Sequence, residues 1–437
     1  MNLQNRDLQA LWHPCSQMKD YESFSPVEIK SAFGSVLHSA DGEIIDIISS
    51  WWCKSLGHRH PGIQKSVLDQ MQKFEHVILA NTTNELIVNL CEKILAACPG
   101  YDKVFFCDSG SDSVEVAMKM SLQYHAQNNN PQKNKFLSLQ NGYHGETILT
   151  LAAGDCDLYG SPFAGLMPEI GKIESLPYIA SPGALDLEQS WQSIEKQLNS
   201  QTETLSGILI EPILQGAGGM LLYEPALIKK LDDWCRAHEV HLIADEILTG
   251  MGRLGRARAC ELAGVVPHFS VFSKGLTGGF SPMACVLTTN SIYEKFYDDY
   301  ESGKAFMHSN TYCGNAIGAA AAMGALQAYE DEGIFTRVER DSHLLRDSFA
   351  EVNEALDCLQ NIRGIGFVAA ADLKPELVDK LQIQRLGYAI YKEAVKRGLL
   401  LRPLGNTLYL LPPLNMPAEL LQKSTGIIID SLRAISD

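Results

Sequence analysis

The chain has 437 residues, of which 46% are hydrophobic and 20% charged, and its formal net charge is −16. The length and composition are typical of a globular protein of two domains, and the acidic balance excludes nucleic acid and anionic membrane as main partners. The longest run of small residues, 316–326, is too short to span a bilayer.

The predicted elements begin with a β-hairpin over residues 34–48 that turns at Asp41-Gly42. Short apolar strands then alternate with helices, which is typical of a mostly parallel sheet covered on both faces. We expect the strands at 104–107, 135–138, 207–210, 241–244, 269–273 and 284–288, and helices at 114–124, 227–235 and 314–332. Further on, helical segments at 335–356 and 375–397 flank short strands at 366–371 and 408–411.

This order predicts an α/β fold with a large domain and a smaller α+β domain. We assign residues 61–333 to the large domain and 334–437 to the small one, and expect residues 1–60 to pack with the small domain. The first residues contain no apolar signal-peptide core. Eleven irregularly spaced cysteines, with no Cys-x-x-Cys pair, indicate reduced thiols in a cytoplasmic protein.

Two predicted strands end in charged residues that belong together chemically. Lys274 ends the apolar stretch 271–273 and is followed by glycines, and Asp245 ends the stretch 240–244. A buried, unpaired lysine is costly and needs a chemical reason, although a strand-end lysine can also simply face solvent. The pair favours pyridoxal 5'-phosphate (PLP), with Lys274 as the imine partner of the aldehyde and Asp245 on the pyridine nitrogen.

A phosphate site is predicted where the strand 104–107 meets the next helix. Ser109, Gly110 and Ser111 precede that helix, so unpaired N–H groups, hydroxyls and the positive helix end suit a phosphate monoester. The alternative is a capping box with Ser111 or Asp112 as the N-cap. Tyr143, between Gly142 and Gly145, is placed to stack on a planar cofactor ring, or is a tyrosine in an ordinary turn.

Other chemistries have weaker support. The stretch 250–255 matches G-x-G-x-x-G, but no acidic residue follows about twenty positions on and no helix clearly opens there, so we reject a nicotinamide site. His58 and His60 have no third ligand at a metal-like spacing. There is no Gly-x-Ser-x-Gly elbow for a nucleophilic serine.

Taken together, these motifs resemble the class III (ω-type) aminotransferases of PLP fold type I, over about residues 11–434. Within the class the likeness is to the diaminopelargonate aminotransferase branch, and it lies in the segments Trp12-His13-Pro14, 49–52, 141–145, 215–219 and 401–405. The resemblance implies conversion of 8-amino-7-oxononanoate to 7,8-diaminononanoate in biotin synthesis. It also implies ping-pong transfer through pyridoxamine phosphate, between a small-molecule amino donor and a keto acid.

The resemblance implies a role for each matching residue. Lys274 would bind the cofactor and move the proton, Asp245 would keep the pyridine nitrogen protonated, and Ser109, Gly110 and Ser111 would hold the phosphate. Thr311 would complete that cup from the partner subunit of a homodimer. The substrate-binding residues would be Tyr143, which also stacks on the ring, together with Trp51, Trp52, Glu146, Arg402 and Tyr409.

The chain departs from the family pattern at three places, and the first and third bear on the amino donor. Cys15 stands where an aromatic residue usually walls the pocket, Glu146 replaces a common aspartate, and Ser309-Asn310 replaces Gly-Pro before Thr311. Cys15 offers little aromatic face to a sulfonium, so we expect lysine rather than S-adenosylmethionine. Two alternatives stay open: a class III enzyme acting on ω-amino acids or polyamines with pyruvate, and a PLP-binding protein without turnover.

Overall fold

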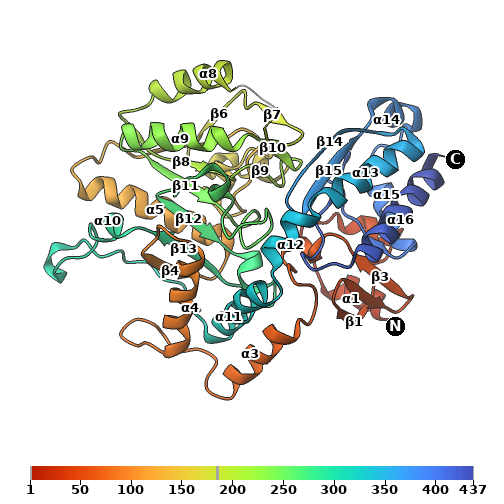
Figure 1. Cartoon of the computed structure of the whole chain (residues 1–437), viewed down its shortest axis with the longest axis horizontal. Helices are drawn as coiled ribbons and strands as arrows, with labels where there is room; N and C mark the ends of the chain where they lie inside the picture. The colour runs from red at the N-terminus through yellow and green to blue at the C-terminus, as the bar shows by residue number, and fades with distance from the viewer. Residues whose placement is uncertain (1, 184–186, 437) are drawn as a thin grey trace.

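The computed structural model describes residues 2–183 and 187–436, and the chain forms two lobes (Figure 1). The large lobe is built on a seven-stranded sheet of order β4-β13-β12-β11-β8-β5-β6. The small lobe holds a four-stranded sheet, β1-β2-β3-β16, and a three-stranded one, β14-β15-β17. The predicted α/β class is therefore confirmed. The large-sheet strands are β4 (Lys103–Cys107), β5 (Lys135–Leu139), β6 (Gly171–Ile173), β8 (Leu205–Ile210), β11 (His241–Asp245), β12 (Phe269–Phe272) and β13 (Ala284–Thr288).

Six of these strands were predicted from the sequence, and all six form within two residues of the expected bounds. Neighbouring strands pair in parallel from β12 through β11, β8 and β5 to β6, whereas β13 runs antiparallel between β4 and β12. Because β13 is antiparallel to both of its neighbours, β4 and β12 run in the same direction. Five loops that follow strands therefore open at one edge of the sheet, where open α/β folds bind their ligands.

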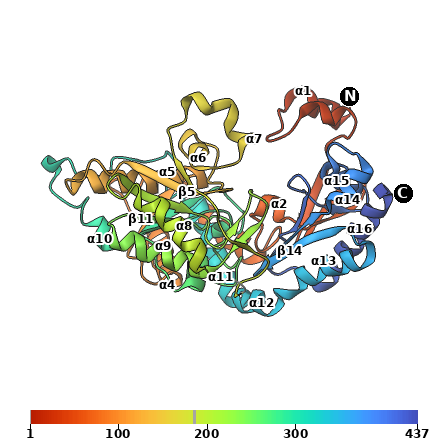
Figure 2. The ribbon, with the colours of Figure 1, turned by 90° about the horizontal axis from the view of Figure 1, so that it is seen from above.

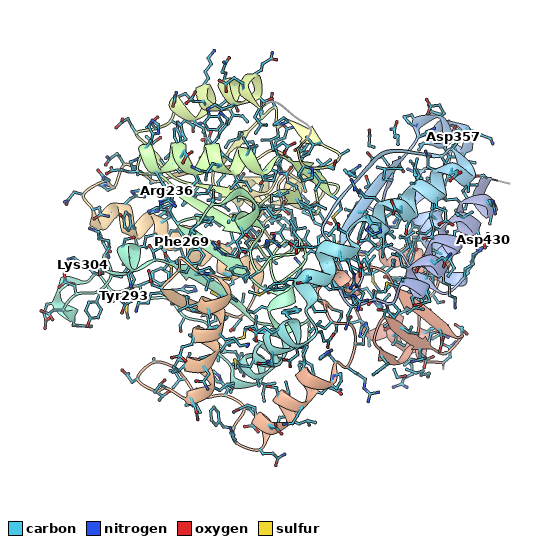
Figure 3. The ribbon with its side chains drawn as sticks, in the orientation of Figure 1. Arg236, Phe269, Tyr293, Lys304, Asp357 and Asp430 are labelled. Atoms are coloured by element: carbon cyan, nitrogen blue, oxygen red, sulfur yellow. The ribbon has the colours of Figure 1, made fainter. Side chains whose placement is uncertain are left out.

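Helices cover both faces of the large sheet, which explains its continuous apolar strands. On one face, Val114 and Met118 of α5 (Gly110–Gln127) pack with Ile243 and Phe269, and Figure 3 marks Phe269 in the centre of the lobe. The other face is covered by α9 and α11. The remaining helices of the large lobe include α3 (Pro61–Met71), α4 (Glu85–Ala97), α6 (Ile148–Ala153), α7 (Asp157–Gly160), α8 (Glu188–Asn199), α9 (Pro225–Ala237), α10 (Asn290–Tyr293) and α11 (Ala316–Asp331).

The two ends of the chain meet in the small lobe (Figure 2). The predicted hairpin forms from β2 (Val36–Ser39) and β3 (Glu43–Asp46). β3 also pairs in parallel with β16 (Leu399–Leu400), so the N-terminal strands and the C-terminal part share one sheet. The boundaries proposed at residues 61 and 334 stay a prediction. The other elements of this lobe are α1 (Leu3–Ala10), β1 (Ile29–Phe33), α12 (Ile334–Asp341), α13 (His343–Leu356), β14 (Leu359–Ile365), β15 (Val368–Leu373), α14 (Pro375–Leu381), α15 (Leu386–Lys396), β17 (Thr407–Leu410) and α16 (Ala418–Ser436).

Two buried arginines join the lobes, one from each side. Arg253 of the large lobe donates to the carbonyl oxygens of Phe367, at 3.1 Å, and Pro412, at 2.7 Å. Arg363 of β14 donates in the opposite direction, to the carbonyl oxygens of Met220, at 2.9 Å, and Gly219, at 2.6 Å. Both side chains are almost fully buried. Because buried guanidinium groups need partners, these bonds determine how the lobes sit against each other.

Arg253 lies in the stretch 250–255 that matches the dinucleotide pattern. This stretch forms consecutive turns rather than opening a helix, and the next helical turn begins only at Ala259. Its task in the fold is to dock the small lobe.

None of the helices among the described residues has an apolar stretch long enough to cross a membrane.

We predict that Arg363→Ala lowers the free energy of unfolding by about 3 kcal/mol, because the carbonyl oxygens of Met220 and Gly219 lose their buried donor and Asp372 loses its ion-pair partner. Denaturant unfolding of the cofactor-free protein measures this loss. The matched control is Arg433→Ala, whose partner Asp430 is 3.8 Å away at the surface. It should change the free energy by less than about 0.5 kcal/mol. Equal effects of the two substitutions would contradict the role given to Arg363.

Candidate active site

The residues singled out from the sequence meet at one edge of the large sheet. In chain order, the edge carries residues 108–111 after β4, Tyr143 after β5, Glu211 after β8, Asp245 at the end of β11 and Lys274 after β12. The carboxyl edge therefore assembles groups that lie more than 160 positions apart in the sequence.

The first turn of α5 holds the residues that are predicted to form a phosphate cup. Ser109 is the N-cap, and its hydroxyl accepts the N–H of Asp112 at 3.2 Å. The predicted alternative, with Ser111 or Asp112 as the cap, is wrong, because the helix begins earlier. Ser111 is left to face the neighbouring loop, where its hydroxyl accepts the N–H of Glu146 at 3.3 Å. The helix N-terminus still offers its dipole and first N–H groups to an anion.

Two glycines let the surrounding loops approach this cup closely. A Cβ at Gly145, whose φ is +127°, would lie 2.1 Å from the hydroxyl oxygen of Ser111. A Cβ at Gly218 would lie 2.1 Å from the carbonyl oxygen of Asn141. The glycines of both sequence motifs are therefore required by contacts between the strand-end loops.

Asp245 is part of a buried group of three side chains. Its carboxylate lies 2.9 Å from Nδ1 of His144 and accepts the N–H of Ile247 at 3.1 Å. Nε2 of His144 is buried and has no hydrogen-bond partner among the described residues. Glu211 accepts the N–H groups of Tyr143 and Gly216, both at 2.9 Å.

Burial raises the pKa of Glu211 to about 7; Asp245 adds to this effect, and His144 and the two N–H donors oppose it. The strand-end segments of the sequence contain both Glu211 and His144, but no local pattern assigns either of them a role. Their function depends on Asp245, which lies 34 and 101 positions further along the chain.

Lys274 stands at the centre of the edge with a strained backbone. Its φ is +37°, a left-handed value that is uncommon for a residue with a Cβ. Burial lowers the pKa of its amine, while Asp245 and Glu211 act in the opposite direction. The lowered pKa favours the neutral amine, which is the nucleophilic form.

Buried hydrogen bonds of Tyr329 hold the loop that carries Lys274 in place. The hydroxyl of Tyr329 donates to the carbonyl oxygen of Gly275 at 2.6 Å and also contacts the hydroxyl of Ser55 at 2.6 Å. These buried bonds connect the Lys274 loop to α11 and to the segment after the paired tryptophans.

The paired tryptophans form one wall above Lys274. Trp52 is buried, with its ring centre 5.5 Å from Nζ of Lys274, and its indole N–H donates to the hydroxyl of Tyr409 at 3.0 Å. Trp51 is 44% exposed and lies under the guanidinium of Arg402, 4.0 Å from the ring centre. Two groups of the small lobe, Arg402 and Tyr409, therefore lie against the paired tryptophans.

Tyr143 lines the opposite side. Its hydroxyl donates to Glu146 at 3.1 Å, and its ring packs edge-on against Tyr159 at 5.9 Å. Burial, and next the charge of Glu146, raises the pKa of Tyr143, so the phenol is a neutral donor. The structure thus places Glu146 against Tyr143 and leaves its carboxylate exposed at the entrance.

A cavity of about 630 Å³ opens beyond Arg402. The thiol of Cys15, at its rim, contacts the hydroxyl of Tyr159 at 3.8 Å. Tyr159 therefore brings an aromatic ring next to the position where Cys15 offers none, which sequence reasoning missed because the two residues are 144 positions apart. The lining includes Cys15, Tyr21, Tyr159, Tyr388, Tyr391 and Arg402.

Thr311 is exposed and lies outside the group just described. The next residue, Tyr312, donates its N–H to Asp108 at 3.4 Å, so the segment runs past the loop after β4.

A family model, "Aminotransferase class-III", matches residues 17–432 of the chain. The chain belongs to the class III aminotransferases. Members of this family are PLP-dependent, so the chain is a PLP-dependent aminotransferase that acts on a small-molecule amino donor and a keto acid.

Relatives within this family match the chain from end to end. It is 36% identical to the adenosylmethionine-8-amino-7-oxononanoate aminotransferase of Helicobacter pylori, with 99% of this chain and 98% of the relative covered. The enzyme of the same name from Synechococcus elongatus is 35% identical, with 97% and 99% covered. The crystal structure of that aminotransferase from Methanocaldococcus jannaschii superposes with a TM-score of 0.90 at 27% identity, covering 99% and 98%.

We expect Asp245→Asn to slow the half-reaction with an amine by at least about a hundredfold. The amide keeps the shape but removes the negative charge that would favour a protonated pyridine nitrogen. Stopped-flow absorbance of the cofactor measures the half-reaction, and cofactor titration measures binding, which should change far less. The control is Asp102→Asn, at the opposite end of β4, where Asp102 accepts the N–H of Asn290. Near-normal rates in Asp245→Asn would show that Asp245 is only structural.

Proposed function

We propose that this class III aminotransferase converts 8-amino-7-oxononanoate to 7,8-diaminononanoate in biotin synthesis. The observation that carries the proposal is end-to-end similarity, at up to 36% identity, to enzymes whose names specify this keto acid. The site has features that suit the substrate. An apolar wall, Trp51 and Trp52, would contact the acyl chain. Arg402, whose guanidinium lies 4.0 Å from the ring centre of Trp51, would bind the terminal carboxylate.

The residues at the sheet edge fit the PLP that the family requires. The first turn of α5, with Ser109, Gly110 and Ser111, would hold the phosphate. Asp245 would face the pyridine nitrogen and Tyr143 the ring. The neutral amine of Lys274 would hold the cofactor covalently.

When bound, the cofactor supplies an electron sink and stores the amino nitrogen between the two half-reactions. The amine of Lys274 would accept the proton from the substrate carbon and later donate it again. Its lowered pKa keeps the amine ready to accept that proton. The buried Asp245–His144 pair would hold the negative charge in place during both steps, because His144 fixes one carboxylate oxygen.

Tyr159 and the cavity beside it supply the aromatic surface that Cys15 lacks. Four tyrosines and Arg402 line a space of about 630 Å³, which is larger than lysine needs. Aromatic faces suit both a sulfonium and a purine ring, and the relatives' names specify adenosylmethionine. We therefore propose S-adenosylmethionine, in place of lysine, as the donor.

The donor is tested by single-turnover conversion of the cofactor with each amine, followed by addition of the keto acid. We expect S-adenosylmethionine to convert it at least about tenfold faster than lysine at equal concentration, since only the larger donor fills the cavity. 8-Amino-7-oxononanoate should then restore the original absorbance. Faster conversion by lysine would reinstate the expectation drawn from Cys15.

The same experiment separates the remaining alternatives. Restoration by pyruvate but not by 8-amino-7-oxononanoate would indicate an enzyme for ω-amino acids or polyamines. Membership of the aminotransferase family already disfavours a PLP-binding protein without turnover.

We further propose a homodimer in which Thr311 reaches the phosphate cup of the partner. The segment after α10 projects from the large lobe (Figure 1); Tyr293 ends α10, and Lys304 lies on the projection (Figure 3). Large apolar side chains on it face solvent in the single chain, with Tyr300 91% and Met307 86% exposed. Exposed apolar groups of this size favour a protein interface.

Shared sites predict complementation between two inactive variants. Lys274→Ala mixed with Thr311→Glu, under conditions in which subunits exchange, should regain up to about a quarter of wild-type activity. Half of the dimers formed at random are hybrids, and each has one intact site. Lys274→Ala mixed with Asp245→Asn is the control, because both changes affect the same chain's site and no intact site can form. Failure of the first mixture, with exchange verified, would argue for self-contained sites.

We also propose that the protein works in the cytoplasm. No disulfide joins its eleven cysteines, all of which lie within the described ranges, and this fits a reducing compartment.

A further inference from the structure

The paired tryptophans lie on a left-handed backbone turn, a conformation that is unfavourable for residues with a Cβ. Ser49, Ser50, Trp51 and Trp52 have φ values of 50°, 45°, 78° and 71°, so four consecutive residues are left-handed and none is glycine. The left-handed conformation brings Cβ too close to the following carbonyl oxygen and is normally confined to isolated residues. Such a turn persists only if its surroundings hold it.

The carboxylate of Asp46 is the group that holds this turn. Asp46 is fully buried at the end of β3, and both of its oxygens are used. Oδ1 accepts the N–H groups of Ile48, at 3.3 Å, and Ser50, at 2.9 Å. Oδ2 accepts the hydroxyl of Ser50, at 2.6 Å, and lies 3.0 Å from Nε2 of His58.

His58 is itself anchored by the backbone. Its N–H donates to the carbonyl oxygen of Gly34 at 2.7 Å, and the N–H of Gly34 donates back at 3.0 Å. His58 and His60, which are close in sequence, turn to different carboxylates, because His60 pairs with Glu332. The Asp46–His58 contact thus connects the turn to the hairpin of the small lobe.

The position of Asp46 connects it to both walls of the substrate site. The turn points Trp52 at Lys274 and Tyr409, and Trp51 at Arg402. In the sheet, Asp46 is also the register partner of Leu400, two residues before Arg402. One buried carboxylate therefore stands where the segments bearing Trp51 and Arg402 meet.

We propose that Asp46, supported by His58, is a positioning residue that holds the left-handed turn and so sets the substrate pocket between the tryptophans and Arg402. It touches neither the reacting atoms nor Lys274, and it acts through Trp51 and Trp52. The identity of the keto acid used below rests on the proposed function, whereas the positioning role does not.

Asp46→Ala removes all four acceptor contacts. We expect KM for 8-amino-7-oxononanoate to rise at least about tenfold, because the turn relaxes towards right-handed values, while kcat changes less than about threefold, because Lys274 and Asp245 are on other strands. In the cofactor-free protein, tryptophan emission should shift to longer wavelength as Trp52 gains solvent. Asp46→Asn, which keeps an acceptor for the two N–H groups, should restore most of the wild-type KM and emission.

A glycine substitution separates positioning from general stability. Ser50→Gly in the Asp46→Ala background allows φ near 45° without a Cβ and should lower KM again by about tenfold. The matched control is Glu239→Gly, in the exposed turn before β11 and at the opposite edge of the sheet from Lys274, where φ is 52°. It relieves similar strain far from the site and should leave KM of Asp46→Ala unchanged.

The proposal is overturned if Asp46→Ala keeps wild-type KM and emission, or if the two glycines restore KM equally. It is also overturned if Asp46→Ala fails to fold both alone and with Ser50→Gly, which would show a role in folding only. A wild-type protein that does not use 8-amino-7-oxononanoate would disprove the proposed substrate. The emission of Asp46→Ala and of its Ser50→Gly derivative would still decide the positioning role.

Discussion

The site depends on one constraint, a lysine amine buried beside two carboxyls at the carboxyl edge of a parallel sheet. Burial lowers the pKa of Lys274, and burial also raises the pKa of Glu211. Both shifts reduce charge, as expected where water is excluded. Asp245 keeps its partner His144 in a hydrogen bond of 2.9 Å. The edge can therefore offer a nucleophilic amine and a fixed carboxylate within one pocket.

The second requirement is that a separate lobe faces this edge in a fixed position. Arg253 and Arg363 cross the junction in opposite directions and bind carbonyl oxygens on the far side. Arg402, a residue of the small lobe, consequently lies over Trp51. The residues predicted to do the chemistry belong to the large lobe, whereas Arg402 and Tyr409, predicted to bind the substrate, belong to the small one. This division suits a family whose members share one cofactor reaction and differ in substrate.

Much of this arrangement followed from the sequence alone. The apolar runs around residues 104–107 and 241–244 are short and bounded by polar residues, so they specify strands with little help from distant contacts. Because parallel strands end at a common edge, Lys274 and Asp245 could be brought together without a structure. The helix start near Ser109 was also recognisable, although the exact cap residue was not. These features are local, and local propensity and periodicity determine them.

Only the tertiary structure decided the rest, because the contacts involved join residues far apart in the chain. The partner of Cys15 is Tyr159, and nothing near either residue predicts the other. Likewise, no pattern around Trp51 reveals a left-handed turn, because serine and tryptophan have no preference for it; the turn exists through the buried carboxylate of Asp46. The sequence by itself determined which groups could do the chemistry. Packing between the lobes decided how the side chains of these groups are oriented, because their orientation depends on contacts between residues far apart in the chain.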